Sequence, residues 1–337
     1  MLLVIGALSF VLYHLVYGLL SHAANSQTPR KPVDVNDVIK TSVTVLTLIG
    51  AVLAGIYAYR KQLLAEGDAH RADASQLADR YTTAAEQLGH ERAAVRLAGV
   101  YALARLADDW EEQRQVCVDV LCAYLRMPYN PDPTATEHKT GEREVRHTII
   151  RVIRDHLQNP DAPTSWCRFD FDFTGGTFDG GDLSGSSFRG RVSFADSVIS
   201  SGTVSFERAE FLPGSSISFT HAQFNGGTIC FDRTEFFHSS GVSFDRARFN
   251  GGEVTFKRAW FNGCMVTFNH SEFDGSEVDF FRARGTDGAV IFAHSEFNSG
   301  TVSFFRAEFT NDMVSFDRSR FNGSAFDWGP LPDLASA

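Results

Sequence analysis

The stretch V-S-F-D-R-A-R-F-N-G-G-E at residues 242–253 decides the fold, because variants of it return with a period of about 12 residues. Its first phenylalanine recurs at Phe194, Phe206, Phe219, Phe231, Phe244, Phe256, Phe268, Phe280, Phe292, Phe304 and Phe316. Five positions after each comes Ile199, Phe211, Phe224, Phe236, Phe249, Phe261, Phe273, Phe297, Phe309 or Phe321, and only Gly285 interrupts this second column. A short fixed period indicates units that bury an apolar face by stacking on each other.

Spacing within each unit predicts how it folds. Val or Ile stands two residues before the first phenylalanine, and a small residue stands two before the second, as Val242 and Ala247 do. Residues two apart lie on one side of an extended backbone. A coil made of a single unit would be too narrow for two phenylalanines, so we expect a four-sided coil made of two units, about 24 residues in all. Pairs such as Gly251-Gly252 fall where the chain turns a corner, and positive φ is expected there.

The start of the repeat carries a family resemblance. Large residues stand five apart at Phe173, Phe178, Leu183 and Phe188, with Gly176, Gly181 and Ser186 at the small inward position. This pattern resembles the pentapeptide-repeat proteins, and the resemblance implies a right-handed quadrilateral β-helix over residues 166–328. From Phe194 on, two residues are added to every second unit, which changes the corners and leaves the stacking intact.

The N-terminal part, residues 1–61, is predicted to be a membrane anchor. Residues 2–20 and 41–59 each form a nearly uncharged run, long enough as a helix to cross about 28 Å of hydrocarbon. Tyr57 and Tyr59 stand where interfacial aromatic residues belong. The first run is alternatively a cleaved signal peptide, since Ser21 and Ala23 have the spacing of a cleavage site.

Basic residues favour one orientation of this anchor. Arg60 and Lys61 follow the second run directly and Arg71 comes soon after. Cytoplasmic flanks carry an excess of Lys and Arg. We therefore expect a multi-pass protein of the plasma membrane whose remaining parts face the cytoplasm, although the connecting loop also holds Arg30 and Lys40.

Residues 62–158 have a helical period instead. Helices are expected up to Leu88, over 93–107 as a helix buried nearly all round, over 116–125 and over 144–157. The run at 92–107 resembles the inner helix of HEAT-like repeats, and helical segments of this kind precede pentapeptide repeats in some membrane-linked bacterial proteins. We expect this segment to cap the first coil. Trp328 and the C-terminal tail at 329–337, with Pro330 and Pro332, are expected to plug the last coil.

Catalytic and metal-binding motifs are not found. The chain has no phosphate-cradling loop, no nucleophile elbow and no convergent triad, so we predict no enzyme and no cofactor. The five cysteines form no pair or ligand cluster and are expected to be buried thiols. His221, His270 and His294 share one side of the expected coil, but no ligand set completes a metal site.

The opposite corner of the coil offers a candidate contact surface. A ladder of arginines is expected at Arg208, Arg233, Arg258, Arg282 and Arg306. Stacked like charges cost free energy unless neighbours offset them. Trp260, Phe281 and Phe305 point outward on the same side, and aromatic residues among arginines are typical of protein interfaces. Phe281 and Phe305 alternatively stack on each other and on the arginines for stability.

Two functions follow from these features. The first is a non-enzymatic scaffold, tethered to the membrane, that binds an unknown protein partner and no nucleic acid directly. The second follows from the resemblance, because some pentapeptide-repeat proteins imitate acidic DNA and bind DNA gyrase. Residues 166–337 carry 22 acidic and 14 basic residues, a net charge of −8, which fits such mimicry. The arginine ladder and the expected membrane anchor argue against it.

Overall fold

The computed structural model describes residues 2–26, 34–135, 139–309 and 314–329. The chain forms two compact units, Met1–Gln76 and Leu77–Ala337. The helices are α1 (Leu2–Asn25), α2 (Val35–Leu88), α3 (Ala93–Asp109), the short 3-10 helix η1 (Glu111–Gln113), α4 (Arg114–Arg126) and α5 (Glu142–Leu157). All 27 strands of the described residues follow α5.

The first unit contains the two apolar runs of the sequence. Residues 2–20 lie within α1, and residues 41–59 lie within α2, which continues unbroken through the expected boundary after residue 61. Among the described residues, α2 is the one helix long and apolar enough to cross a membrane, and the side chains of that stretch are not buried. Two spans and their orientation therefore stay predictions.

The second unit begins with a helical bundle. Leu77, Tyr81, Ala84 and Leu88, at the end of α2, pack on the core of this bundle. Glycine is required at position 99 because a Cβ there would lie 2.5 Å from the backbone nitrogen of Leu88.

The expected helices of the bundle are confirmed within a few residues, with one error. Helix α3 is not buried all round: α4 and α5 cover one side of it, while Tyr101 and Arg105 face solvent.

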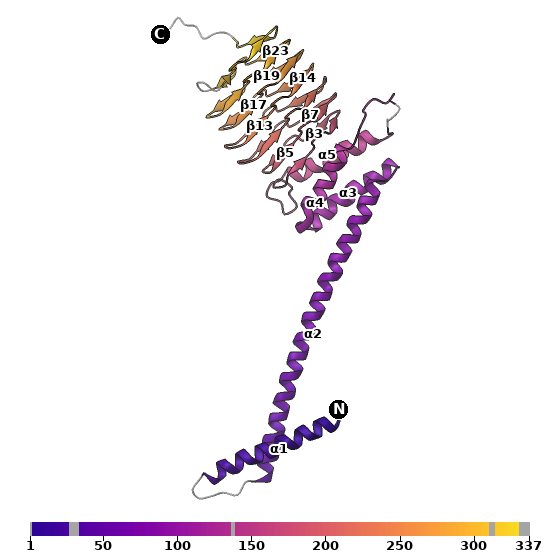
Figure 1. Ribbon diagram of the computed structural model, residues 1–337, viewed down its shortest axis with the longest axis vertical. Coiled ribbons are helices and arrows are strands. Elements are labelled where there is room, and N and C mark those ends of the chain that lie inside the picture. The colour runs from indigo at the N-terminus through magenta and orange to yellow at the C-terminus, as the bar shows by residue number, and fades with distance from the viewer. Residues whose placement is uncertain (1, 27–33, 136–138, 310–313, 330–337) are drawn as a thin grey trace. The chain divides into compact units, whose positions relative to one another are not determined.

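The strands form four parallel sheets, one on each side of a coil. Figure 1 shows the strands of successive coils stacked on each other. Sheet A contains β1 (Phe171–Asp172), β5 (Arg191–Ser193), β9 (Ser216–Ser218), β13 (Gly241–Ser243), β17 (Met265–Thr267), β21 (Ala289–Ile291) and β25 (Val314–Ser315). Sheet B contains β2 (Thr177–Phe178), β6 (Val198–Ile199), β10 (Gln223–Phe224), β14 (Arg248–Asn250), β18 (Glu272–Asp274), β22 (Glu296–Phe297) and β26 (Arg320–Phe321). Sheet C contains β3 (Gly181–Asp182), β7 (Thr203–Ser205), β11 (Thr228–Cys230), β15 (Glu253–Thr255), β19 (Ser276–Asp279), β23 (Gly300–Ser303) and β27 (Ala325–Asp327). Sheet D contains β4 (Ser187–Phe188), β8 (Glu210–Phe211), β12 (Glu235–Phe236), β16 (Trp260–Asn262), β20 (Arg284–Thr286) and β24 (Glu308–Phe309).

The register confirms a four-sided coil made of two repeat units. Val242 pairs with Ile217 in the preceding coil and with Val266 in the following one. The first coil is shorter, since Phe171 pairs with Val192, a step of 21 residues that is close to the 20 of four plain five-residue units. The chain after the helices is therefore a β-solenoid.

Stacked phenylalanine rings fill the solenoid. Phe244 lies between Phe219 and Phe268, with ring centroids 4.9 and 4.7 Å apart and planes nearly parallel. The neighbouring column is equally regular, for Phe249 and Phe273 lie 4.7 Å apart. Each such ring is fully buried, so the expected aromatic spine is confirmed.

Gly285 interrupts the column of sheet D, and the gap is partly filled. The rings of Phe261 and Phe309, which belong to coils on either side of Gly285, approach to 6.2 Å and lie tilted. Gly285 itself lies in strand β20 and is buried. The backbone there is extended, so nothing in its conformation demands glycine.

Positive φ occurs at the corners after the second phenylalanine of a unit and at those after the first. The sequence led us to expect it only after the second. Glycines after the second phenylalanine take it, as Gly251 does at 78°. The corners after the first phenylalanine also take it, with Arg or His at the critical position, as at Arg258 (61°). A left-handed residue that is not glycine costs about 1 kcal/mol.

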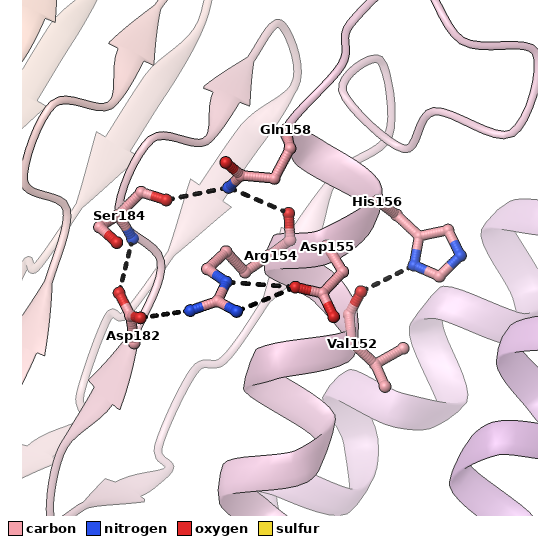
Figure 2. A network of polar contacts seen from close by, with 7 residues as sticks. All are labelled: Val152, Arg154, Asp155, His156, Gln158, Asp182 and Ser184. Atoms are coloured by element: carbon pink, nitrogen blue, oxygen red, sulfur yellow. Dashed lines mark hydrogen bonds and ion pairs between the residues drawn. The ribbon is translucent and has the colours of Figure 1, made fainter.

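The helical segment covers the first coil, as predicted. Figure 2 shows Arg154 of α5 between Asp155 and Asp182 of β3, and Gln158 reaching the carbonyl oxygen of Ser184 at 2.9 Å. The buried guanidinium of Arg146 also donates to the carbonyl oxygens of Tyr124, Leu125 and Thr177, and so joins α4, α5 and the solenoid.

At the other end, Trp328 stacks on Phe304 with centroids 4.8 Å apart. The expected plug at Pro330–Pro332 lies outside the described residues. The five cysteines are unpaired. Four of them are buried, as expected, whereas Cys230 is partly exposed. Burial raises the pKa of Cys117 to about 11 and that of Cys264 to about 12.

Candidate functional site

The turns between sheets C and D bring the predicted arginines together. In each turn the small residue donates its N–H to the carbonyl of the preceding phenylalanine, as Ala259 does to Phe256 at 3.0 Å. The arginine lies between them at positive φ. Its own N–H donates to the next turn, from Arg258 to Phe281 at 2.9 Å and from Arg282 to Phe305 at 3.1 Å. The arginine ladder, defined as Arg208, Arg233, Arg258, Arg282 and Arg306, is therefore continuous along this corner.

The ladder has two parts with different electrostatics. Arg208 and Arg233 both face Glu207, at 3.8 and 3.1 Å. By contrast, the remaining three have no carboxylate within 4 Å among the residues that the structure describes. We call these three, Arg258, Arg282 and Arg306, the unpaired triad. Among the described residues, no ion pair offsets the repulsion between adjacent arginines in this part of the corner.

Two aromatic residues support the unpaired triad. Phe281 and Phe305 occupy the turn position before Arg282 and Arg306, and their rings stack at 5.9 Å with planes 7° apart. The guanidinium carbons of Arg282 and Arg306 lie over the rings at 5.2 and 5.3 Å. Both phenylalanines are half-buried by these contacts, so much of their surface is used within the protein, as the stabilising alternative predicts.

Trp260 differs from these phenylalanines. It lies on β16 in register with Glu235 and Arg284, and 52% of its surface is exposed. In the described part of the chain it contacts no other aromatic ring. An exposed tryptophan beside unpaired arginines is the feature of this corner that packing does not explain.

Sequence reasoning missed Arg284 and considered Glu308 only as a carboxylate able to offset the arginine ladder. Arg284 and Glu308 lie on sheet D two positions after Arg282 and Arg306, and they form an ion pair at 3.1 Å. With the unpaired triad they line a shallow depression on this face. Their position in the repeat could have revealed them, because the first outward residue of each strand in sheet D lies two positions after a ladder arginine and therefore beside the ladder.

The corner between sheets A and B holds the histidines. His270 and His294 stack with centroids 4.8 Å apart, as their positions predicted. Asp196 begins the same column and lies 3.7 Å from His221. No group of three or more His, Cys, Asp and Glu side chains among the described residues could hold a metal ion.

The helical cap holds a carboxyl group with a clearly lowered pKa. Burial of Asp179 would raise its pKa, but hydrogen bonds from His147, Tyr129 and Arg143 outweigh this effect and lower the pKa to about 2. Both carboxylate oxygens are occupied by these donors. The shift therefore reports a structural ion cluster, which perturbs a pKa as effectively as a catalytic site does.

Comparisons with known proteins add little to this geometry. No protein-family model and no curated protein matches the chain. A solved structure, that of HetL, a pentapeptide-repeat protein involved in heterocyst differentiation regulation from the cyanobacterium Nostoc sp. strain PCC 7120, is similar over 46% of this chain and 87% of its own. The identity is 10% and the TM-score 0.13, so the β-solenoid rests on the chain's own strand pairing.

Proposed function

We propose that this chain is a non-enzymatic scaffold that is anchored in the plasma membrane and presents its solenoid to the cytoplasm as a protein-interaction module. Its contact surface is the unpaired triad together with Trp260, Phe281 and Phe305. The observation that carries this proposal is the exposed Trp260 beside three arginines that lack a carboxylate partner in the described structure. Tryptophan and arginine are the residues most enriched at interface hot spots.

Stability alone accounts poorly for this surface. Glu207 forms ion pairs with Arg208 and Arg233, so the fold has a way to offset stacked arginines. No described carboxylate does the same for the unpaired triad. Trp260 leaves 52% of its surface exposed. A partner would neutralise the charges and cover the indole, and the same positive charges oppose imitation of acidic DNA.

Membrane anchoring is supported by the first unit. The apolar half of α2 exposes large side chains, among them Leu48, Val52, Leu53 and Ile56. Exposed apolar surface on this scale needs lipid or protein cover. We infer two spans, at residues 2–20 and 41–59, with the positive flank at Arg60 and Lys61 on the cytoplasmic side. We also infer that the repeats are of the pentapeptide type with a HEAT-like segment before them.

Site-specific photocrosslinking tests the contact surface. Thr286→p-benzoylphenylalanine places the probe at an exposed position of sheet D, two residues from Arg284. Gln223→p-benzoylphenylalanine places it on sheet B, on the opposite side of the coil. With full-length protein in native membranes, we expect a protein adduct from position 286 that is absent from position 223.

A triple variant separates binding from packing. Trp260→Ala, Phe281→Ser and Phe305→Ser together should abolish the adduct at position 286, while circular dichroism shows the strand content retained. Trp260→Ala alone tests the same contact without disturbing the stacked phenylalanines. An unchanged adduct in both variants, or no adduct at position 286, would contradict the proposed surface.

A further inference from the structure

The unpaired triad also indicates what kind of surface the partner presents, an inference that rests on the proposed function. Its three arginines stand on consecutive coils, joined by hydrogen bonds between adjacent turns. Consecutive strands of a sheet lie about 4.8 Å apart. The corner therefore places three arginines on backbone positions at a regular spacing, and a partner with carboxylates at a matching spacing would fit it best.

We propose that the unpaired triad binds the acidic face of an α-helix in a partner protein, with one carboxylate per helical turn against each arginine. A helix repeats about every 5.4 Å along its axis, so over two steps its carboxylates drift from the ladder by only about 1 Å. Side chains on one face of a strand repeat about every 6.8 Å and drift by about 4 Å. Flexible arginines absorb the first mismatch more easily than the second.

Two of the three guanidiniums are already positioned for such a partner. Arg282 and Arg306 lie over the Phe281 and Phe305 rings, which are themselves stacked. A side chain held before binding loses less conformational entropy when it binds. Arginine–carboxylate bonds with two parallel contacts are among the stronger charged hydrogen bonds, so three of them specify a register along the helix axis.

Charge and surface chemistry favour a protein over a nucleic acid. The whole chain has a net charge of −10, and a phosphate backbone brings dense negative charge to every nearby surface, including acidic ones. A helix concentrates its carboxylates on one stripe and offers apolar side chains beside it. Trp260, exposed next to Arg284 on sheet D, is placed to contact such an apolar side chain.

Binding of designed peptides to the full-length protein in detergent micelles tests this inference by fluorescence anisotropy. The probe is an alanine-rich peptide, stapled as a helix, with Glu at positions i, i+4 and i+7. A second stapled peptide has the same composition with its Glu residues spread around the helix. An extended Glu-Thr peptide and an oligothymidine complete the set. We expect the one-stripe helix to bind at least ten times more tightly than each of the other three.

Paired protein variants locate the binding. Arg258→Gln, Arg282→Gln and Arg306→Gln together should weaken binding of the one-stripe helix at least tenfold. Arg208→Gln with Arg233→Gln, the matched change on the ion-paired part of the ladder, should weaken it less than twofold. Equal binding of the one-stripe and scattered helices, tighter binding of the extended peptide or oligothymidine, or equal losses in both variants would overturn the inference.

The photocrosslinked adduct distinguishes this inference from the proposed function. If an adduct forms at position 286 and its partner segment carries carboxylates one helical turn apart, both stand. An adduct on a segment without such carboxylates would overturn the helix inference and leave the contact surface intact. If no adduct forms, the proposed function fails, and the peptide measurements alone decide what the triad recognises.

Discussion

The helical cap and the solenoid fill their interiors by opposite means. In the solenoid, identical phenylalanines stack and every strand between the two end coils bonds to the coils before and after it. The cap instead buries arginines: Arg114 donates to the carbonyls of Ala107 and Pro163, and Arg146 to carbonyls of α4 and the first coil. In a repeat, the backbone N–H and C=O groups of one coil form hydrogen bonds with the same groups of the next coil. A helical cap covers strand edges whose hydrogen-bonding groups its own backbone cannot match. Charged side chains bridge that mismatch.

From this contrast we expect the largest loss of stability when a phenylalanine in the middle of the aromatic spine is removed. Phe244→Ala removes a fully buried ring from between two others and leaves a cavity that rigid coils cannot close. We expect the free energy of unfolding to fall by about 4 kcal/mol, measured by urea titration of the protein in micelles. Phe321→Ala is the control, since that ring is 54% exposed at the end of the solenoid. Equal losses would show that the spine does not stabilise by burial.

Substitution of one polar residue of the cap, Arg146, should lower the stability nearly as much. Arg146→Met keeps the apolar stem but removes the donors to Tyr124, Leu125 and Thr177. Leaving these carbonyls buried without partners should destabilise the protein by about 3 kcal/mol in the same titration. The matched control is Arg105→Met on the exposed side of α3, which should change stability by less than about 0.5 kcal/mol. If Arg146→Met were neutral, packing alone would hold the cap.

The cap, unlike the spine, should also respond to acid. The pKa of Asp179 is lowered to about 2 in the folded protein from an ordinary value of 3.8, so its ionised form stabilises the fold above the ordinary pKa. That contribution, about 2 kcal/mol at pH 7, should be lost as the pH falls from about 5 to about 2. Groups facing the carboxylate are Tyr129, Arg143 and His147.

Asp179→Asn measures this contribution directly. The variant should unfold more easily than the native protein at pH 7, and the difference should shrink towards pH 2. Asp196→Asn, on an exposed solenoid corner, should show no comparable trend. A difference that grows as the pH falls would mean that the carboxylate destabilises the cap.

The same contrast explains what could be predicted from sequence. The period fixes which residues are copies of each other, so the four sides, the buried columns and the arginine ladder follow once Phe244 and Phe249 are recognised as successive inward positions. The contacts of the cap do not repeat. Nothing in the sequence near Arg146 reveals that its partners are carbonyls of α4 and of the first coil, because those contacts depend on how helices meet a particular coil.

Within the site, sequence placed side chains on the correct corner but not their local chemistry. The pairing of Phe281 with Phe305 could be expected from their spacing. The left-handed backbone at Arg282 could not, because arginine has no preference for that conformation. Glu207 lies one coil from Arg233 and two coils from Arg258, but only the structure shows that Arg258 has no other carboxylate partner among the described residues. Which carboxylates compensate the ladder therefore became visible only in three dimensions.

A smaller effect is expected where the spine is interrupted. Gly285→Phe should restore an unbroken column, because the backbone is extended there and Phe309 can return to its own layer. Since Phe309 already fills part of the gap, the gain in unfolding free energy should be about 1 kcal/mol and not that of a full ring. Thr286→Phe, one residue along on the outward side, should give no gain. A lower unfolding free energy with Gly285→Phe would show that Phe261 and Phe309 leave no room for another ring.

The smallest effect is expected in the arginine ladder itself. It tests whether the arginine of a turn contributes to the stability of the fold. Arg258 has a φ of 61°, and glycine adopts this conformation without strain, though it loses more backbone entropy on folding. Because its side chain has no carboxylate partner in the described structure, Arg258→Gly should raise the unfolding free energy by about 0.5 kcal/mol. Arg233→Gly also loses the contact with Glu207, so its unfolding free energy should rise by less. A gain at position 258 would mean that the arginine is kept at a cost to stability, as a binding residue would be, whereas a loss would mean that its aliphatic stem packs along the corner and that the ladder begins as part of the fold.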